Sequence, residues 1–483
     1  MIPAPTRART PGVPAVRAIP MPDDEKTTKV PKSRLARTAR FGSLVGGQGV
    51  KWTATNVANR VRSDDRAAAA NERRALDLAD QLVKQLGQMK GAAMKIGQVL
   101  STVDFDLIPE SEREEFKGRL AALRDSAPKV AFKDMRKVAE RDIGGTLDEH
   151  FASFDERPIA AASIGQVYRA TTHEGDDVAV KIQYPGVAEA VETDLRNVQL
   201  LVPLLKRMAP GMDAKALLGE LRERIADELD YEIEAQNQRR VHRAFRDHPF
   251  VKIPRVHTDL STRRVLVTEF VDGVGFDAVK QLDDAGRDRF AEIAFRFFYG
   301  LLEREHIAAG DPHPGNYILC PDGKVCFLDF GLVRHVDDDY LEGEQALARA
   351  VIHGDAEGVH HWMSTLGYLP DPDDFHPERV LEQLQIAGEW YFTTGFRRLD
   401  PDYVRNAMEV GSSPRSEHFD YMRMQTLPPQ ALLIRRMEGL LFGVLGELRA
   451  GADWGRLALE YVADEPPSTE MGEVEAEYLA TKA

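Results

Sequence analysis

The sequence has few cysteines and no long apolar run, and both absences exclude classes of protein. Only two cysteines occur in 483 residues, which excludes a small domain held together by disulfides. We expect Cys320 and Cys326, which lie in short apolar segments, to be buried free thiols in a reducing compartment. No run of about 18 apolar residues occurs, because Arg435, Arg436 and Glu438 interrupt the best candidate. The sequence therefore predicts no membrane-spanning helix.

The beginning of the chain also lacks a secretory signal, since its proline- and arginine-rich residues include no apolar core segment. We therefore expect a cytoplasmic protein. The net charge of −15 is unevenly distributed: residues 1–75 are basic and the rest is acidic. The acidic body argues against nucleic-acid binding. The basic leader either contacts an anionic membrane surface peripherally or is a solvated, mobile arm.

Changes in residue pattern divide the chain into five parts. Helical periodicity dominates at first, short β-rich runs appear around Ile159, and helical patterns return after Phe276. We expect an α+β protein in which a strand-rich lobe precedes a helix-rich lobe. The predicted parts are a basic, largely disordered leader (1–66), a helical extension (67–126), a strand-rich lobe with inserted helices (127–275), a helical lobe (276–463) and a flexible acidic tail (464–483).

Short segments within the two lobes give more local expectations. Strands are predicted at 166–170, 177–183 and 264–270, and long helices at 187–208 and 214–245. A hairpin is predicted from 317–320 and 325–328, because Pro321-Asp322-Gly323 between them is a typical turn sequence.

The strongest candidate for chemistry surrounds this hairpin. Asp311 stands five residues before Asn316, and Asp329 opens an Asp-Phe-Gly segment after the hairpin. Phosphoryl transfer from a nucleotide uses one carboxylate facing the attacking hydroxyl, and an amide with a second carboxylate holding Mg²⁺. The spacing is that of protein kinases. It predicts ATP and Mg²⁺ as cofactors, Asp311 as catalytic residue, and Asn316 and Asp329 as metal ligands.

The first lobe contains the matching half of a nucleotide site. Segment 178–181 reads as a strand that ends at Lys181, the position whose ammonium contacts the α- and β-phosphates in kinases. The segment before it aligns with a glycine-rich phosphate loop in which alanine replaces the first two glycines, so backbone amides can cradle phosphate with less conformational freedom. The candidate loop residues are Ala160, Ala161, Ala162, Ser163, Gly165 and Val167.

An acidic stretch is expected to lie on the predicted helix at 214–245. Asp230, Glu234 and Asn237 are spaced i, i+4, i+7 and would share one face, with Glu228 nearly opposite Asp230. One face could meet Lys181; the alternative is a solvated acidic face.

Two further features are ambiguous by themselves. Glu269 ends the last strand expected in the first lobe, where backbone groups could meet the adenine edge; an ordinary strand-end glutamate is the alternative. Upstream, Lys95-Ile96-Gly97-Gln98 lies near a helix end and has an ordinary structural explanation. Neither identifies a site alone.

Together these motifs resemble the UbiB-like (AarF-type) atypical kinases, a family that includes proteins supporting ubiquinone biosynthesis. The resemblance covers roughly residues 67–333 and rests on the KxGQ signature at 95–98, the alanine-rich loop at 160–163, the ExD region at 228–237 and the DPHPGN loop at 311–316. It implies a bilobal protein-kinase-like fold with an N-terminal helical KxGQ extension.

The resemblance also implies roles for the candidate residues. Lys181 would be the nucleotide lysine and Glu234 its partner, Asp311 would be the catalytic aspartate, and Asn316 and Asp329 would bind Mg²⁺. A cluster covering the place of a peptide substrate would consist of Lys95, Gln98, Glu228 and Asp230.

Departures from the kinase pattern shape the functional expectation. Ala309 replaces a histidine usual in the family, and His313 replaces a kinase lysine, either to face the γ-phosphate or in a structural role. No long activation segment follows Gly331, which argues against general protein phosphorylation. We expect ATP binding with slow hydrolysis and a lipid or isoprenoid partner. The alternatives are a small-molecule phosphotransferase similar to aminoglycoside or choline kinases, and a nucleotide-gated lipid-binding chaperone or pseudokinase without turnover.

Overall fold

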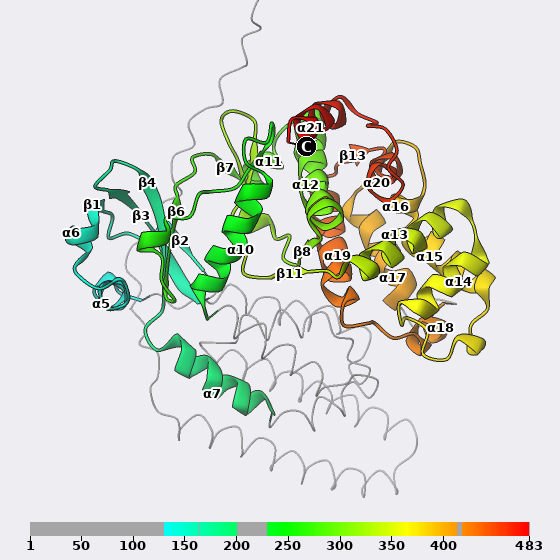
Figure 1. Cartoon of the computed structure of the whole chain (residues 1–483), viewed down its shortest axis with the longest axis horizontal. Coiled ribbons are helices and arrows are strands. Elements are labelled where there is room, and N and C mark those ends of the chain that lie inside the picture. Colours follow the sequence, from blue (N-terminus) through cyan, green and yellow to red (C-terminus); the bar gives the residue numbers. More distant parts are fainter. Residues whose placement is uncertain (1–129, 163, 200–228, 413–417, 483) are drawn as a thin grey trace, which may run out of the picture.

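The computed structural model describes residues 130–162, 164–199, 229–412 and 418–482. A sheet-containing lobe packs beside a larger helical lobe (Figure 1), as expected from the sequence. The predicted leader at 1–66 and the whole of the helical extension predicted at 67–126 lie outside the described residues.

The first lobe is built on an antiparallel sheet in the order β1-β3-β4-β6. Its strands are β1 (Phe151–Phe154), β2 (Ala160–Ala161, paired with β3), β3 (Gly165–Thr172), β4 (Asp177–Gln183) and β6 (Val265–Glu269). Val178, Val180 and Ile182 of β4 are fully buried, and their alternation fixes the register of this central strand. The three strands predicted here are confirmed.

Helices accompany this sheet. They are α5 (Phe132–Ile143), α6 (Leu147–His150), α7 (Val187–Gln199) and α10 (Tyr231–Ala244), of which α5 packs on β4 and β6 and α10 on β6. The described part of the predicted helix at 187–208 is helical.

The prediction of one continuous helix at 214–245 is wrong. Helix α10 begins only at Tyr231, because Asp230 has an extended backbone (φ −127°) and caps the helix by accepting a hydrogen bond from the Glu232 amide. Aspartate competes for backbone amides in this way and so favours caps over helix interiors. Asp230 therefore does not continue the face that carries Glu234 and Asn237.

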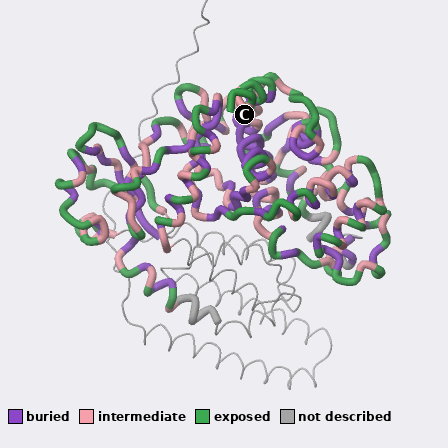
Figure 2. The backbone as a smooth tube through the Cα atoms, in the orientation of Figure 1, coloured by how far each residue is buried: buried purple, intermediate pink, exposed green. Residues whose placement is uncertain are grey.

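The second lobe surrounds α12 (Asp284–Glu305), which is buried along most of its length (Figure 2). Its other helices are α11 (Phe276–Val279), α13 (Asp338–His353), α14 (Ala356–Thr365), α15 (Pro377–Ala387), α16 (Glu389–Phe392), α17 (Pro401–Ser412), α18 (Phe419–Met424), α19 (Ala431–Glu447), α20 (Trp454–Val462) and α21 (Glu470–Ala480). A helix that is apolar on nearly all sides belongs in a core, and α12 is the centre of the largest hydrophobic cluster.

Short strands connect the helices of the second lobe and carry several of its loops. They are β5 (Val251–Lys252), β7 (Val274–Gly275), β8 (Ile307–Ala309), β9 (Tyr317–Leu319), β10 (Val325–Phe327), β11 (Val333–His335), β12 (Arg397–Arg398) and β13 (Gly451–Ala452). Strands β9 and β10 form the predicted hairpin, with Gly323 at positive φ in its turn. Cys320 and Cys326 are buried and free, as expected. Within the described ranges, every helix is too short or too polar to cross a membrane.

The end of the chain differs from the expected flexible tail. Helix α21 lies against α12 (Figure 1), and the Glu475 side chain is only 1% exposed because it pairs with Arg296 and Arg304 of α12. The sequence shows the acidic residues of this segment but not their buried arginine partners, so the segment resembles a solvated tail.

Candidate active site

Lys181 and Glu234 form a buried ion pair between the sheet and helix α10. Lys181 lies in β4 opposite Val167 and Leu266, and its Nζ donates to both carboxylate oxygens of Glu234 at 2.8 and 2.9 Å. The Glu234 side chain is 5% exposed and that of Lys181 21%. Burial lowers the pKa of Lys181, but Glu234, Tyr231 and Asp329 outweigh it and hold that pKa well above its ordinary value. The lysine is therefore a permanent cation.

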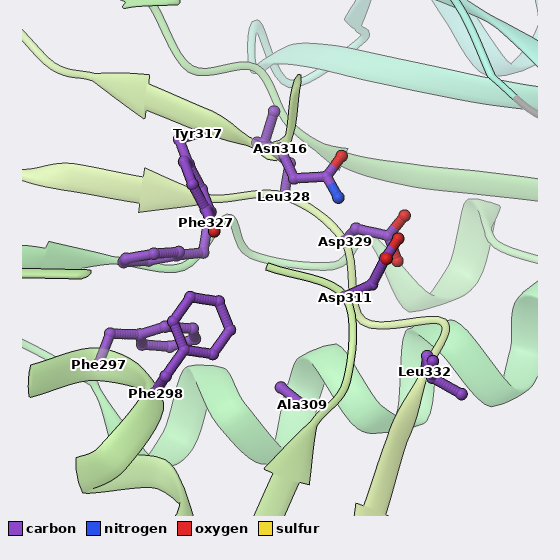
Figure 3. A pocket seen from close by; sticks show the side chains of 10 residues that line it. All are labelled: Phe297, Phe298, Ala309, Asp311, Asn316, Tyr317, Phe327, Leu328, Asp329 and Leu332. Atoms are coloured by element: carbon purple, nitrogen blue, oxygen red, sulfur yellow. The ribbon is translucent and has the colours of Figure 1, made fainter. Parts of the chain in front are cut away.

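The three oxygen-bearing candidates of the second lobe line one small cavity (Figure 3). Asp311 follows strand β8, Asn316 ends a 3₁₀ turn before β9, and Asp329 follows β10. The side chains of Asp311 and Asp329 both line the cavity, and the Asn316 amide points toward Asp329 in Figure 3. Aromatic rings support the cavity: Phe297, Phe298, Tyr317 and Phe327.

This donor set suits Mg²⁺ better than a metal that needs an all-protein cage. Among the described residues, no group of three or more His, Cys, Asp and Glu side chains is placed to hold a metal. The cavity offers two carboxylates and one amide, all oxygen donors. Mg²⁺ is typically bound through one or two carboxylates together with waters and substrate phosphates. The residues fit that ion.

Helix α10 connects the two halves of the site. Its Glu234 holds Lys181, and one turn further along its Asn237 donates to the Phe330 carbonyl at 3.0 Å. The Asp329 carboxylate in turn accepts a hydrogen bond from the Gly331 amide at 2.9 Å, which fixes the side chain in a local turn. The face shared by Glu234 and Asn237 thus ties the lysine to the Asp-Phe-Gly segment.

Arg436 is a site residue that the sequence analysis missed. From helix α19 it donates to Asp311 Oδ1 at 3.1 Å and to the Gly310 carbonyl at 2.8 Å. A Cβ on Gly310 would meet the side chain of Leu433 of the same helix, which would then have to move. The only signal in the sequence is an arginine within an apolar helix. His313 Nδ1 accepts a hydrogen bond from the Gly315 amide.

The alanine-rich loop is a tight hairpin at the edge of the sheet. Ala160 pairs with Val167 and Ala161 with Gln166, and the Ala162 amide donates to the Gly165 carbonyl at 2.8 Å. A Cβ on Gly165 would lie 2.3 Å from the Ile182 carbonyl, so glycine is needed for this strand pairing.

The remaining candidate residues do not line the cavity around Asp311 and Asp329 or are not described. The Glu269 amide donates to the Arg255 carbonyl and its carboxylate pairs with Lys252 at 2.8 Å, and a contact of this strand end with adenine stays a prediction. At the start of α10, the Oδ2 atom of Asp230 lies 3.5 Å from the Nε atom of Arg263. Lys95, Gln98, Ser163 and Glu228 lie outside the described residues, and the expected cluster with Asp230 stays a prediction.

Comparison with known proteins gives consistent matches. The pattern of the ABC1 atypical kinase-like domain matches residues 122–363. The rat protein "Atypical kinase COQ8B, mitochondrial" is 30% identical over 393 residues, which cover 79% of this chain and 74% of the rat protein. The Arabidopsis thaliana "Protein ACTIVITY OF BC1 COMPLEX KINASE 1, chloroplastic" is 32% identical over 308 residues, or 62% of this chain and 44% of the plant protein. The solved structure of Rv3197 with erythromycin from Mycobacterium tuberculosis has a TM-score of 0.60 and 29% identity, covering 83% of this chain and 98% of that chain.

Proposed function

Because this chain belongs to the ABC1 atypical kinase-like family, we propose that it binds Mg-ATP between its lobes and uses it in slow phosphoryl transfer or hydrolysis. The observation that carries this proposal is the connection through α10 of a charged, buried lysine to the Asp-Phe-Gly segment. This arrangement suits a bound triphosphate. A cation held at the phosphate oxygens stabilises the negative charge of the phosphoryl group during its transfer.

The proposed roles follow from where the side chains lie. Lys181, held by Glu234, faces the phosphates as a cation. Asn316 and Asp329 would hold Mg²⁺, which when bound neutralises phosphate charge. Asp311 would accept the proton of the attacking hydroxyl or water, and its hydrogen bond to Arg436 fixes its orientation.

We also propose a lipid or isoprenoid small molecule, rather than general protein substrates, as acceptor or regulator. After Gly331, strand β11 begins at Val333 and α13 at Asp338, so there is no long segment on which a peptide could lie. The basic leader would support peripheral contact with a membrane surface.

Phosphate release with Mg-ATP, measured with and without a detergent-dispersed isoprenoid lipid, tests this proposal. We expect slow release that the lipid changes. Tight Mg-ATP binding without turnover under all conditions would instead indicate a nucleotide-gated binding protein. Turnover with a soluble amino alcohol but not with lipid would favour a small-molecule phosphotransferase.

Replacing Lys181 with methionine should weaken ATP binding by roughly 1–3 kcal/mol, the scale of a charge-assisted hydrogen bond. Nucleotide titration of the folded variant measures this loss. Lys133→Met is a matched control, because Lys133 is exposed on α5. An ATP affinity equal to that of the unmodified protein would remove Lys181 from the site.

Replacing Arg436 with methionine should lower the rate of phosphate release about tenfold or more, because Asp311 would lose the group that orients it. ATP affinity should change little, since Arg436 contacts the loop and not the nucleotide lysine. Separate measurement of kcat and KM distinguishes the two effects, and Arg436→Lys should restore part of the rate. A loss confined to KM would contradict the assigned role.

A further inference from the structure

The helical lobe contains a second and much larger cavity. Its volume is about 510 Å³, within the range of sites for small molecules. The nine helices from α12 to α20 each contribute to its walls, and it shares no lining residue with the cavity around Asp311 and Asp329. Most of the lining is apolar, with rings from Trp390, Tyr391 and Phe442. The nucleotide site does not account for this space.

Some of the residues at the large cavity are apolar and exposed. Met408 and Leu427 line it and are 46% and 48% exposed. Ile386 and Met424, which adjoin lining residues along the chain, are exposed as well. Large apolar side chains grouped on a surface are typical of a binding site.

Charged side chains on the wall are unbalanced. The lining includes three carboxylates, Glu303, Glu344 and Glu438, but one cation, Arg435. The guanidinium of Arg435 is already shared, because it bonds both Glu344 and Glu438. Glu303 instead accepts one hydrogen bond, from Gln345 Nε2 to its Oε2 at 2.8 Å. The cavity therefore has a carboxylate whose second oxygen is not engaged by any described residue.

We infer that this cavity binds a small, largely apolar molecule that carries one protonated amine, and that Glu303 is the partner of the amine. The apolar walls match the body of such a molecule, and the excess of carboxylates matches its positive charge. An anionic lipid would lack a partner for its charge in this cavity, because the one cation of the lining, Arg435, already pairs with two carboxylates. A buried charge needs a partner, and the amine supplies the one that Glu303 lacks.

Protonation of Glu303 makes the site sensitive to pH. Burial raises the pKa of Glu303 to about 7; Glu438 and Glu344 add to the rise, while Gln345 and Arg435 oppose it. Tyr299 and Tyr391 also face this carboxylate, and burial raises their pKa values well above the ordinary one, so both stay neutral. Amine affinity should rise between pH 6 and pH 8 as Glu303 ionises, because an alkyl amine of pKa about 10.4 stays protonated there.

Calorimetric titration with decylamine below its micellar concentration and with decanol below its solubility limit tests the inference. At pH 8 we expect decylamine to bind about tenfold more tightly than decanol, the factor expected of one buried charge-assisted bond. Glu303→Gln should remove this preference and its pH dependence while decanol binding is retained. Equal preference in the variant and the unmodified protein would overturn the assignment of Glu303.

A second variant tests the location. Gly439 lines the cavity, and a Cβ there would meet no atom within 4 Å. Gly439→Phe should therefore fill the space and reduce binding of both ligands at least tenfold, with the fold kept. Undiminished binding in Gly439→Phe would show that the ligands bind elsewhere. Because no nucleotide is present, these outcomes are independent of the proposed phosphoryl transfer.

Discussion

Replacing Asp329 with asparagine should abolish Mg²⁺-dependent ATP binding. Asparagine keeps an oxygen that can accept the hydrogen bond from the Gly331 amide, so the local turn should persist. What disappears is a negative charge next to the metal position. Loss of an outer-shell partner of a metal costs roughly 10–100-fold in affinity, and loss of a direct carboxylate ligand should cost more.

The thermal stabilisation given by Mg-ATP measures this effect. We expect a clear shift in the unmodified protein and none in Asp329→Asn, with the melting temperature without ligand little changed. Asp322→Asn is the matched control, because Asp322 is an exposed carboxylate in the turn of the neighbouring hairpin. Persistence of the Mg-ATP shift in Asp329→Asn would show that the metal assignment is wrong.

The parts of the site that depend on nearby residues could be predicted from the sequence. The strand that carries Lys181, the hairpin and the positions of Asp311, Asn316 and Asp329 each follow from patterns within a few residues. The Lys181–Glu234 pair spans 53 positions and came from the family resemblance together with helical spacing. The break at Asp230 was missed because aspartate is compatible with both a helix surface and a cap.

Contacts that depend on tertiary packing left little signal in the sequence. Arg436 and Asp311 are 125 positions apart, and no local pattern connects them. The large cavity takes its walls from nine helices, whose individual patterns show only that each has an apolar face. In α19 the neighbouring residues Arg435 and Arg436 point to different places, one to the large cavity and one to the Asp311 loop. Since successive residues of a helix are turned by about 100°, one helix contributes to both sites.

Replacing Arg296 with methionine should lower the free energy of unfolding by about 3–5 kcal/mol, the usual cost of breaking a buried ion pair by removing one partner. The Arg296 side chain is fully buried and bonds Glu292, Glu460, Glu475 and Thr469. The Glu460 and Glu475 side chains are 5% and 1% exposed. Without Arg296 these buried carboxylates would lose a positively charged partner, and α21 would lose its main attachment to α12.

The pH dependence of this loss identifies its cause. Burial raises the pKa of Glu475, but His248, Arg304 and Arg296 outweigh it and hold that pKa below the ordinary value. Its stabilising contribution is therefore present above the unfolded-state pKa and lost as the pH falls through the folded-state pKa. Urea unfolding should accordingly show a large difference between Arg296→Met and the unmodified protein at pH 7 and a smaller one at pH 4. Arg289→Met, the same change at an exposed position of α12, should cost less than about 0.5 kcal/mol. A difference that is equally large at both pH values would assign the loss to packing around Arg296 rather than to its charge.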